Sequence, residues 1–178
     1  MNPLAIIEQY YTPSTPLYDT LVRHSLSVRD KALQLAARHA ELGIDTAFVA
    51  EAAMLHDIGI FRTYAPKIFC LGTHDYIEHG YLGAELMRHE GLPRHALVCE
   101  RHTGTGISLE QIERRNMPLP HRDMRPVSIE EQLICYADKF FSKTHLDEEL
   151  TIEHARQKLA RFGDASVEQF DKWVALFE

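Results

Sequence analysis

Residues 52–59 read Ala-Ala-Met-Leu-His-Asp-Ile-Gly, and this stretch decides the fold. A helix capped by Asp45 places Val49 and His56 on the same face, because the two positions recur at helical spacing. Gly59 is expected to end this helix in a left-handed conformation. An imidazole and a carboxylate at a buried helix end are costly unless a partner compensates them. A metal ion would be such a partner.

Length and composition indicate an ordinary globular protein. The chain has 178 residues, of which 45% are hydrophobic and 25% charged, and we expect one domain over residues 1–178. No apolar run reaches the roughly 20 residues that span a bilayer, and no signal peptide is visible, so we expect a cytoplasmic protein without membrane contact. The net charge of −7 argues against an extended nucleic-acid surface. It leaves room for a small anionic substrate at a local cationic site.

The chain has three cysteines, Cys70, Cys99 and Cys135, and they show no C-x-x-C spacing. An odd number without that spacing favours free thiols in a reducing compartment over a disulfide framework. Cys99 and Cys135 are expected to be small core residues and not metal ligands.

Helical periodicity in the long segments predicts an all-α fold, a compact helical bundle. Two capping-box patterns, Ser108 with Gln111 and Ser128 with Glu131, each predict a helix start. Residues 58–77 lack sustained periodicity and are expected to cross the molecule irregularly. The predicted helices cover residues 3–11, 17–42, 45–55, 78–90, 93–102, a short segment from 108, 128–145, 151–162 and 166–176. We expect a core over residues 17–145, with residues 146–178 forming C-terminal helices that pack on it.

Four further polar residues interrupt apolar helix faces in the manner of His56, namely His24, His79, His102 and Asp138. His24, for example, lies between Leu21 and Val28 on one stripe. Taken alone, a histidine on an apolar face is usually a hydrogen-bonded core residue. Taken together with Asp57, six such side chains on five helices would each need a separate partner. One shared metal cluster would compensate the burial of all six side chains.

These residues also carry a resemblance to a known family. The order His24, His56-Asp57, Asp138 resembles the H…HD…D signature of the HD-domain metal-dependent phosphohydrolase superfamily, in its small HDIG-type form. Residues 56–59 match the H-D-I-G variant letter for letter, and residues 79–85 resemble the H-x-x-x-G-A segment of many members. The resemblance covers roughly residues 17–145. It implies an all-α HD-domain fold and bound metal.

The family resemblance also implies how the ligands divide between two ions. One ion would bind the side chains of His24, His56, Asp57 and Asp138. The second would bind Asp57 as a bridging ligand together with His79 and His102. Nitrogen and oxygen donors with a bridging carboxylate suit two divalent ions, with iron or manganese favoured and Mg, Co, Ni or Zn as alternatives.

Several side chains near these motifs are candidates for catalysis or for binding substrate. Many HDIG proteins have a lysine or arginine after the glycine, where this chain has Ile60. Asp57 and Lys139 are the expected catalytic residues, because Asp57 would touch both ions and Lys139 adjoins a ligand. The candidates for substrate contacts are Arg62, Lys67, Arg101 and His74.

The leading functional hypothesis is a metal-dependent phosphohydrolase, a phosphomonoesterase or phosphodiesterase, that acts on a small phosphate ester such as a nucleotide. One alternative is a diiron oxygenase of the same superfamily that cleaves a C–C or C–P bond, because the same ligand order serves both chemistries. Another is a non-catalytic ligand-binding module that retains a metal site, although an intact set of six ligands argues against it. The oligomeric state stays open.

Overall fold

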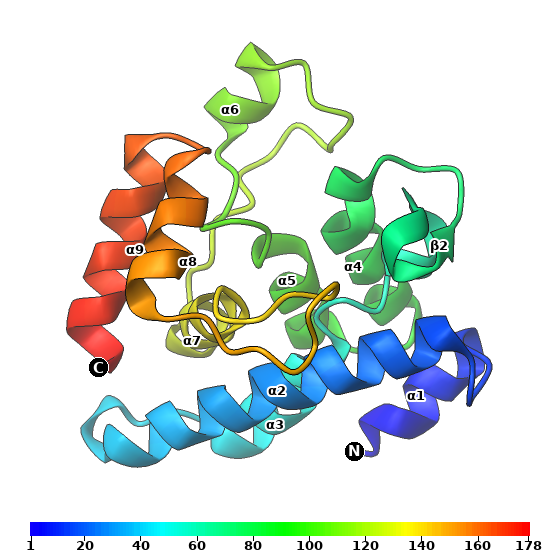
Figure 1. Cartoon of the computed structure of the whole chain (residues 1–178), viewed down its shortest axis with the longest axis horizontal. Helices are drawn as coiled ribbons and strands as arrows, with labels where there is room; N and C mark the ends of the chain where they lie inside the picture. Colours follow the sequence, from blue (N-terminus) through cyan, green and yellow to red (C-terminus); the bar gives the residue numbers. More distant parts are fainter.

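The computed structural model describes residues 1–178 and consists of nine α-helices with one two-stranded antiparallel sheet (Figure 1). The predicted all-α fold is confirmed. The helices are α1 Pro3–Tyr10, α2 Pro16–Arg38, α3 Thr46–Leu55, α4 His79–His89, α5 Pro93–Arg101, α6 Leu109–Arg114, α7 Ile129–Asp138, α8 Ile152–Ala160 and α9 Asp164–Phe177. The strands are β1 Tyr64–Ala65 and β2 Cys70–Leu71, which pair in the irregular crossing.

Short polar side chains start most of these helices. Each accepts a hydrogen bond from an otherwise unpaired amide of the first turn, which contributes about 1 kcal/mol to helix stability. The predicted capping box of Ser108 and Gln111 is present in full. The N-cap side chains are those of Asn2, Thr15, Asp45, Ser108, Ser128 and Thr151.

The helices pack around two large apolar cores that meet along α2 and α3, and a third, small apolar cluster includes Ile112 of α6. α2 packs along α3, α4 packs against α5, and α7 contacts α2, α5 and α9 (Figure 1). α2 contributes Val28 to the first core and Leu21 to the second. His24 lies between these two residues on the same face of α2. The candidate polar cluster therefore begins where the two cores meet.

The C-terminal helices lie against the first core. Trp173 and Phe177 of α9 pack around Tyr136 of α7, and the indole Nε1–H of Trp173 donates to Gln132 at 2.9 Å. The division into a core over residues 17–145 and C-terminal helices over 146–178 stays a prediction. None of the helices has the combination of length and apolar character needed to cross a membrane.

The predicted helix over residues 17–42 is wrong at its end, because α2 stops at Arg38. His39 leaves helical geometry, and its ring contacts two acceptors, Glu41 at 2.9 Å and the Phe177 carbonyl of α9 at 3.0 Å. Residues 40–42 form a separate 3-10 turn that ends at the left-handed Gly43. A contact distant in sequence thus overrides the local periodicity.

The predicted helix over residues 128–145 is also too long, since α7 ends at Asp138. The Lys139 amide donates to carbonyls of the last turn, and the chain then turns back toward α2. The second capping box is incomplete. Ser128 caps the Glu131 amide, but the Glu131 carboxylate binds the Val127 amide and Arg101 in place of the Ser128 amide.

Gly59 has a structural role different from the predicted one. Its φ of −81° is not left-handed, so the glycine is not needed for backbone conformation. A Cβ at this position would instead lie 2.2 Å from the His79 carbonyl oxygen and 2.4 Å from the Gly83 amide nitrogen. Gly59 is therefore required because α4 approaches the backbone closely, which brings His79 beside the end of α3.

Candidate metal centre

The structure brings the six predicted ligands together in one buried cluster. Five of them, including Asp57, lie within two residues of a helix end, where the backbone turns, and His24 lies within α2. His56 follows the last residue of α3, His79 begins α4, His102 follows α5, and Asp138 ends α7. All five helices therefore have to be in place before the cluster exists.

One set of donors surrounds the Oδ2 side of Asp57. Asp57 Oδ2 lies 3.1 Å from His24 Nε2 and 3.0 Å from His56 Nε2. Asp138 Oδ1 lies 3.0 Å from His24 Nε2 and 3.5 Å from His56 Nε2. Donors that share one ion at about 2.1 Å are themselves roughly 3.0 to 3.4 Å apart. The four side chains thus have the spacing of ligands around a common ion.

A second set of donors uses the other oxygen of the same carboxylate. Asp57 Oδ1 lies 3.4 Å from His79 Nε2 and 3.3 Å from His102 Nε2. The two imidazole nitrogens are 3.0 Å from each other. Asp57 therefore contacts both donor sets, one with each oxygen.

Backbone carbonyls fix the orientation of three of the rings. The Nδ1–H groups of His56, His79 and His102 donate to the carbonyl three residues earlier, at 2.7, 2.6 and 2.8 Å. A carbonyl can only accept, so Nδ1 carries the proton in each ring. In a neutral ring the Nε2 lone pair then points into the cluster, which is the arrangement that metal-binding histidines have.

The electrostatics of the cluster keep one pair of rings neutral. Burial lowers the pKa of His79 to about 3, and nearby His102 adds to the effect. Burial also lowers the pKa of His102. Burial alone would lower the pKa of His56, but the carboxylates of Asp57 and Asp138 outweigh it and raise that pKa to about 9. His79 and His102 therefore present lone pairs to Asp57 and not protons.

Several atoms of the cluster have no hydrogen-bond partner although they are fully buried. They include Asp57 Oδ1 and the Nε2 atom of His56, whereas Asp57 Oδ2 is paired with the Lys143 ammonium at 2.6 Å. Such atoms cost free energy unless something else compensates them. Divalent cations would do so, and the nitrogen and oxygen donors suit them. The two sets that fit an ion are His24, His56, Asp57 and Asp138, and Asp57, His79 and His102.

Two lysines border the cluster, and sequence reasoning missed one of them. Lys139 Nζ lies 2.8 Å from Asp138 Oδ2 and donates to the His102 carbonyl at 3.0 Å. Lys143 Nζ lies 2.6 Å from Asp57 Oδ2. In the helix predicted through residue 145, Lys143 would point about 140° away from Asp138. Because the predicted helix extends too far, the sequence does not predict that Lys143 lies beside the cluster.

The predicted substrate contacts occupy other places. Arg101 pairs with Glu131 at 2.9 Å, and His74 lies 3.1 Å from Glu78. Arg62 belongs to the 3-10 turn that precedes β1, and the exposed Lys67 lies in the turn between the strands. None of the four forms an ion pair with a residue of the cluster. Their role in binding substrate stays a prediction.

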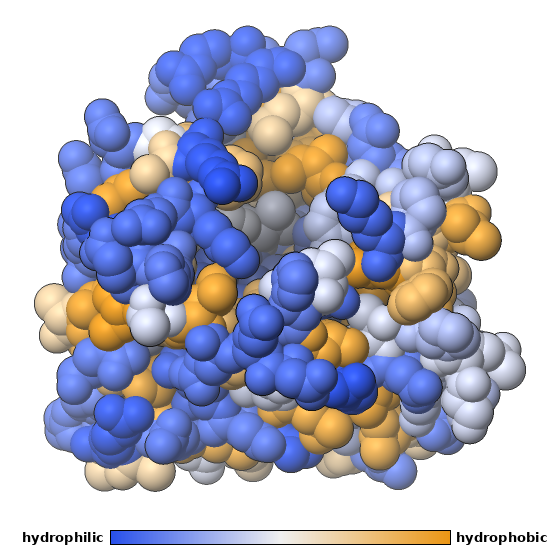
Figure 2. Space-filling view, in the orientation of Figure 1, coloured by the Kyte–Doolittle hydropathy of each residue, from blue (hydrophilic) through white to orange (hydrophobic).

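An apolar cavity of about 350 Å³ adjoins the cluster at His79. Tyr76 lines it and stacks on the His79 ring, with 4.6 Å between ring centroids. Figure 2 shows that the molecule is hollowed between α4, α6 and α8, with hydrophobic side chains along one wall of the hollow. The cavity thus leads from one donor set to the surface. Its remaining apolar side chains are those of Ile77, Ile107, Met117 and Phe162.

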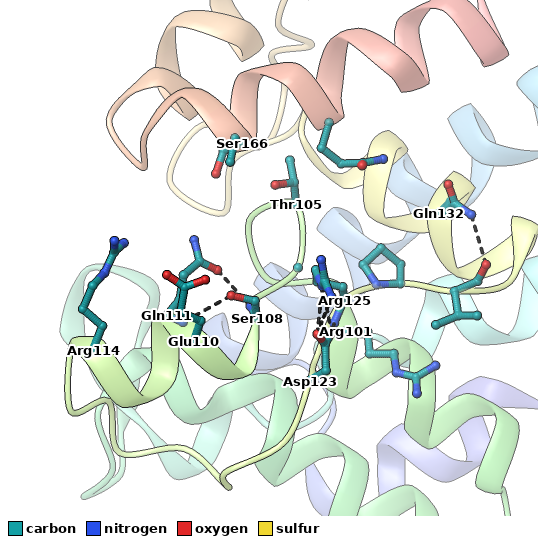
Figure 3. Close-up of a pocket in the computed structure, with 15 residues that line it drawn as sticks. Arg101, Thr105, Ser108, Glu110, Gln111, Arg114, Asp123, Arg125, Gln132 and Ser166 are labelled. Carbon is teal, nitrogen blue, oxygen red and sulfur yellow. Dashed lines mark hydrogen bonds and ion pairs between the residues drawn. The ribbon is translucent and has the colours of Figure 1, made fainter.

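A larger polar cavity of about 810 Å³ contains none of the six cluster residues. Thr105 and Ser166, which line both cavities, project toward each other from a loop and from α9 (Figure 3). In the larger cavity Arg125 is bound to Asp123, and Arg101 is bound to Glu131. This cavity is therefore not where the clustered donors act.

Comparison with known proteins agrees with this geometry. The HD-domain family matches residues 21–142, a range that contains all six clustered residues. An uncharacterised protein of Methanocaldococcus jannaschii is 35% identical over 129 residues, which cover 71% of this chain and 69% of that protein. No solved structure gives a significant match.

Two further relatives have a functional name. They are called tRNA (cytidine(56)-2'-O)-methyltransferase and come from Picrophilus torridus and Thermoplasma volcanium, with 31% and 32% identity. Each match covers 70% of this chain but 32% of the relative. The shared region is therefore about a third of each methyltransferase.

Proposed function

Because this chain belongs to the HD-domain family of metal-dependent phosphohydrolases, we propose that it hydrolyses a small phosphate ester at a centre of two divalent metal ions. The observation that carries the proposal is the position of Asp57. Its two oxygens serve two separate sets of buried donors, at 3.0 to 3.4 Å. A carboxylate with this arrangement suits a bridge between two ions.

The chemistry of such a centre is well suited to phosphate esters. Two divalent ions lower the pKa of water and neutralise charge on phosphoryl oxygens during in-line displacement. The chain holds the donors for this task in a fixed arrangement. The carbonyls behind His56, His79 and His102 keep the rings oriented, and Lys139 holds Asp138 Oδ2 so that Oδ1 faces His24.

The apolar cavity supports a substrate with a compact organic group. At about 350 Å³ it falls in the size range of small-molecule sites, and its walls are mainly hydrophobic. A phosphate at the cluster and an organic group against Tyr76 and Phe162 would use both features. A nucleotide fits this description, whereas an extended nucleic acid fits poorly with the net charge of −7.

The names of the two methyltransferases are not evidence for methyl transfer by this chain. The matched region is 32% of each relative, so the named activity belongs to a much longer protein. The names do not extend the proposal to tRNA itself.

The test is a panel of phosphate monoesters and diesters offered to protein loaded with manganese or iron. We expect phosphate or phosphomonoester release that a chelator abolishes and added metal restores. Asp57→Asn should abolish turnover. The matched control is Asp147→Asn, because Asp147 is an exposed carboxylate outside the cluster. Metal-loaded protein that cleaves no phosphate ester of nucleotide size would contradict the proposal.

A further inference from the structure

Lys143 is a largely buried cation that lies beside the cluster. It belongs to the segment between α7 and α8, which runs beside α2 (Figure 1) and pairs with it through Lys31 and Glu149 at 2.8 Å. Lys143 Nζ is 2.6 Å from Asp57 Oδ2, and the side chain is 12% exposed. Asp57 is its one carboxylate partner within ion-pair distance.

The Lys143 ammonium does not take the place of an ion. In the set of His24, His56, Asp57 and Asp138, each carboxylate oxygen lies 3.0 to 3.5 Å from both imidazole nitrogens, so a cation among them would contact all four side chains. Lys143 forms no ion pair with Asp138, whose partner lysine is Lys139. The ammonium therefore approaches Asp57 from outside the donor set and leaves the set free.

Lys143 lies near Tyr76, a residue that lines the apolar cavity. Its Nζ lies 6.0 Å from the centroid of the Tyr76 ring. Tyr76 in turn stacks on His79 and lines the cavity. The ammonium thus lies beside the bridging carboxylate and close to a residue of the cavity wall.

The charge balance changes when ions bind. Asp57 would then be shared by two cations, so it can no longer offset the charge of Lys143. Lys139 keeps its own contacts with Asp138 and the His102 carbonyl. The two donor sets contain no third carboxylate. Two ions and two lysines around two carboxylates leave an excess of positive charge, which an anion would offset.

We propose that Lys143 binds a phosphoryl oxygen of the substrate and exchanges its contact with Asp57 for this one when ions and substrate are bound. The proposal rests on the proposed function, since it assigns the phosphate ligand of that site.

The experiment measures binding of inorganic phosphate to metal-loaded protein by titration calorimetry. Metal content is measured on every sample. In Lys143→Met we expect unchanged metal content and a phosphate Kd raised about tenfold or more, as for the loss of one hydrogen bond to a charged group. Lys143→Arg keeps the charge and should recover part of the affinity. Lys158→Met, at an exposed lysine of α8, is the matched control and should bind like the wild type.

Two results would overturn the assignment. One is wild-type phosphate affinity in a metal-loaded Lys143→Met protein, and the other is loss of metal from both Lys143 variants, which would make the lysine a support for Asp57. Failure of the proposed hydrolysis can be distinguished from failure of the Lys143 assignment. If Lys143→Met weakens phosphate binding but the wild type cleaves no ester, the assignment of Lys143 as a phosphate ligand is supported and the proposed hydrolysis is contradicted. A metal-loaded wild type that binds no phosphate contradicts both.

Discussion

The Nε2 atoms of His79 and His102 lie 3.0 Å apart, although both rings donate their Nδ1 protons to backbone carbonyls. Burial holds the pKa of each ring below its ordinary value, so both are neutral and direct lone pairs toward each other. Such a pair is unfavourable without a cation between the two nitrogens. The arrangement of these two histidines therefore indicates a site that is complete only when an ion is bound.

Metal binding should consequently raise thermal stability. A ligand at 100 times its Kd stabilises the fold by about 2.7 kcal/mol, which corresponds to roughly 5 to 11 °C in Tm for a chain of this length. We expect this shift when iron or manganese is added to chelator-treated protein, and a smaller one in His79→Gln. His121→Gln, at an exposed histidine outside the cluster, should behave like the wild type. The absence of any shift with divalent ions would count against the centre.

Asp57 should matter more for metal binding than any other ligand. Its oxygens contact both donor sets, whereas His102 contacts one. Asp57→Ala is expected to empty both sites, and His102→Ala to lose mainly the ion that it shares with His79. Elemental analysis of metal per chain checks this. An equal partial loss in the two variants would show that Asp57 is not a bridge.

Gly59→Ala should be strongly destabilising, by about 3 kcal/mol or more, because the new Cβ meets backbone atoms of α4 that have no room to move. The same displacement would move His79 and weaken metal binding. Chemical denaturation and metal titration measure the two effects. Gly43→Asn is a suitable control, since a Cβ there meets nothing within 4 Å and asparagine tolerates a left-handed conformation. Comparable losses in both variants would refute the close-approach explanation.

Stability should fall as the pH drops below about 6.5, in part because of His95. Burial lowers the pKa of His95 in the folded protein, and Glu51, 3.5 Å away, only partly opposes this. Below pH 6.5 the unfolded chain takes up a proton that the folded His95 does not, so the free energy of unfolding decreases.

The contribution of His95 is bounded at about 1.4 kcal/mol per pH unit. We expect a smaller loss of stability between pH 7.5 and 5.5 in His95→Gln than in the wild type at the same metal loading. Denaturant titrations at the two pH values measure the difference. Identical losses in the two proteins would exclude His95 as a source of the pH dependence.

Much of the candidate site can be predicted from the sequence, because its polar residues stand out within short stretches of apolar helix. His24, His79 and Asp138 are polar residues on otherwise apolar helix faces, and that pattern requires no knowledge of the tertiary fold. The H-D-I-G stretch also indicates the HD-domain family. The structure brings the six predicted donors together in two sets that share Asp57.

The helix ends were less predictable, because contacts distant in sequence decide them. The His39 ring leaves α2 to reach the Phe177 carbonyl, and no local signal indicates that partner. The chain turns after Asp138, and Lys143 thereby reaches Asp57 instead of solvent. The sequence predicts a conformational role for Gly59, whereas the glycine is required because the backbone of α4 lies close to it. Each of these features depends on where another segment lies.

Anaerobic turnover tests the central claim most directly. Protein loaded with manganese is incubated without oxygen with the ester that the substrate panel identifies, and released phosphate is measured. We predict full activity under these conditions, because hydrolysis requires only metal ions, water and the cations of the site. If turnover of the true substrate instead requires iron and consumes oxygen, the centre is an oxygenase and the phosphohydrolase proposal is wrong.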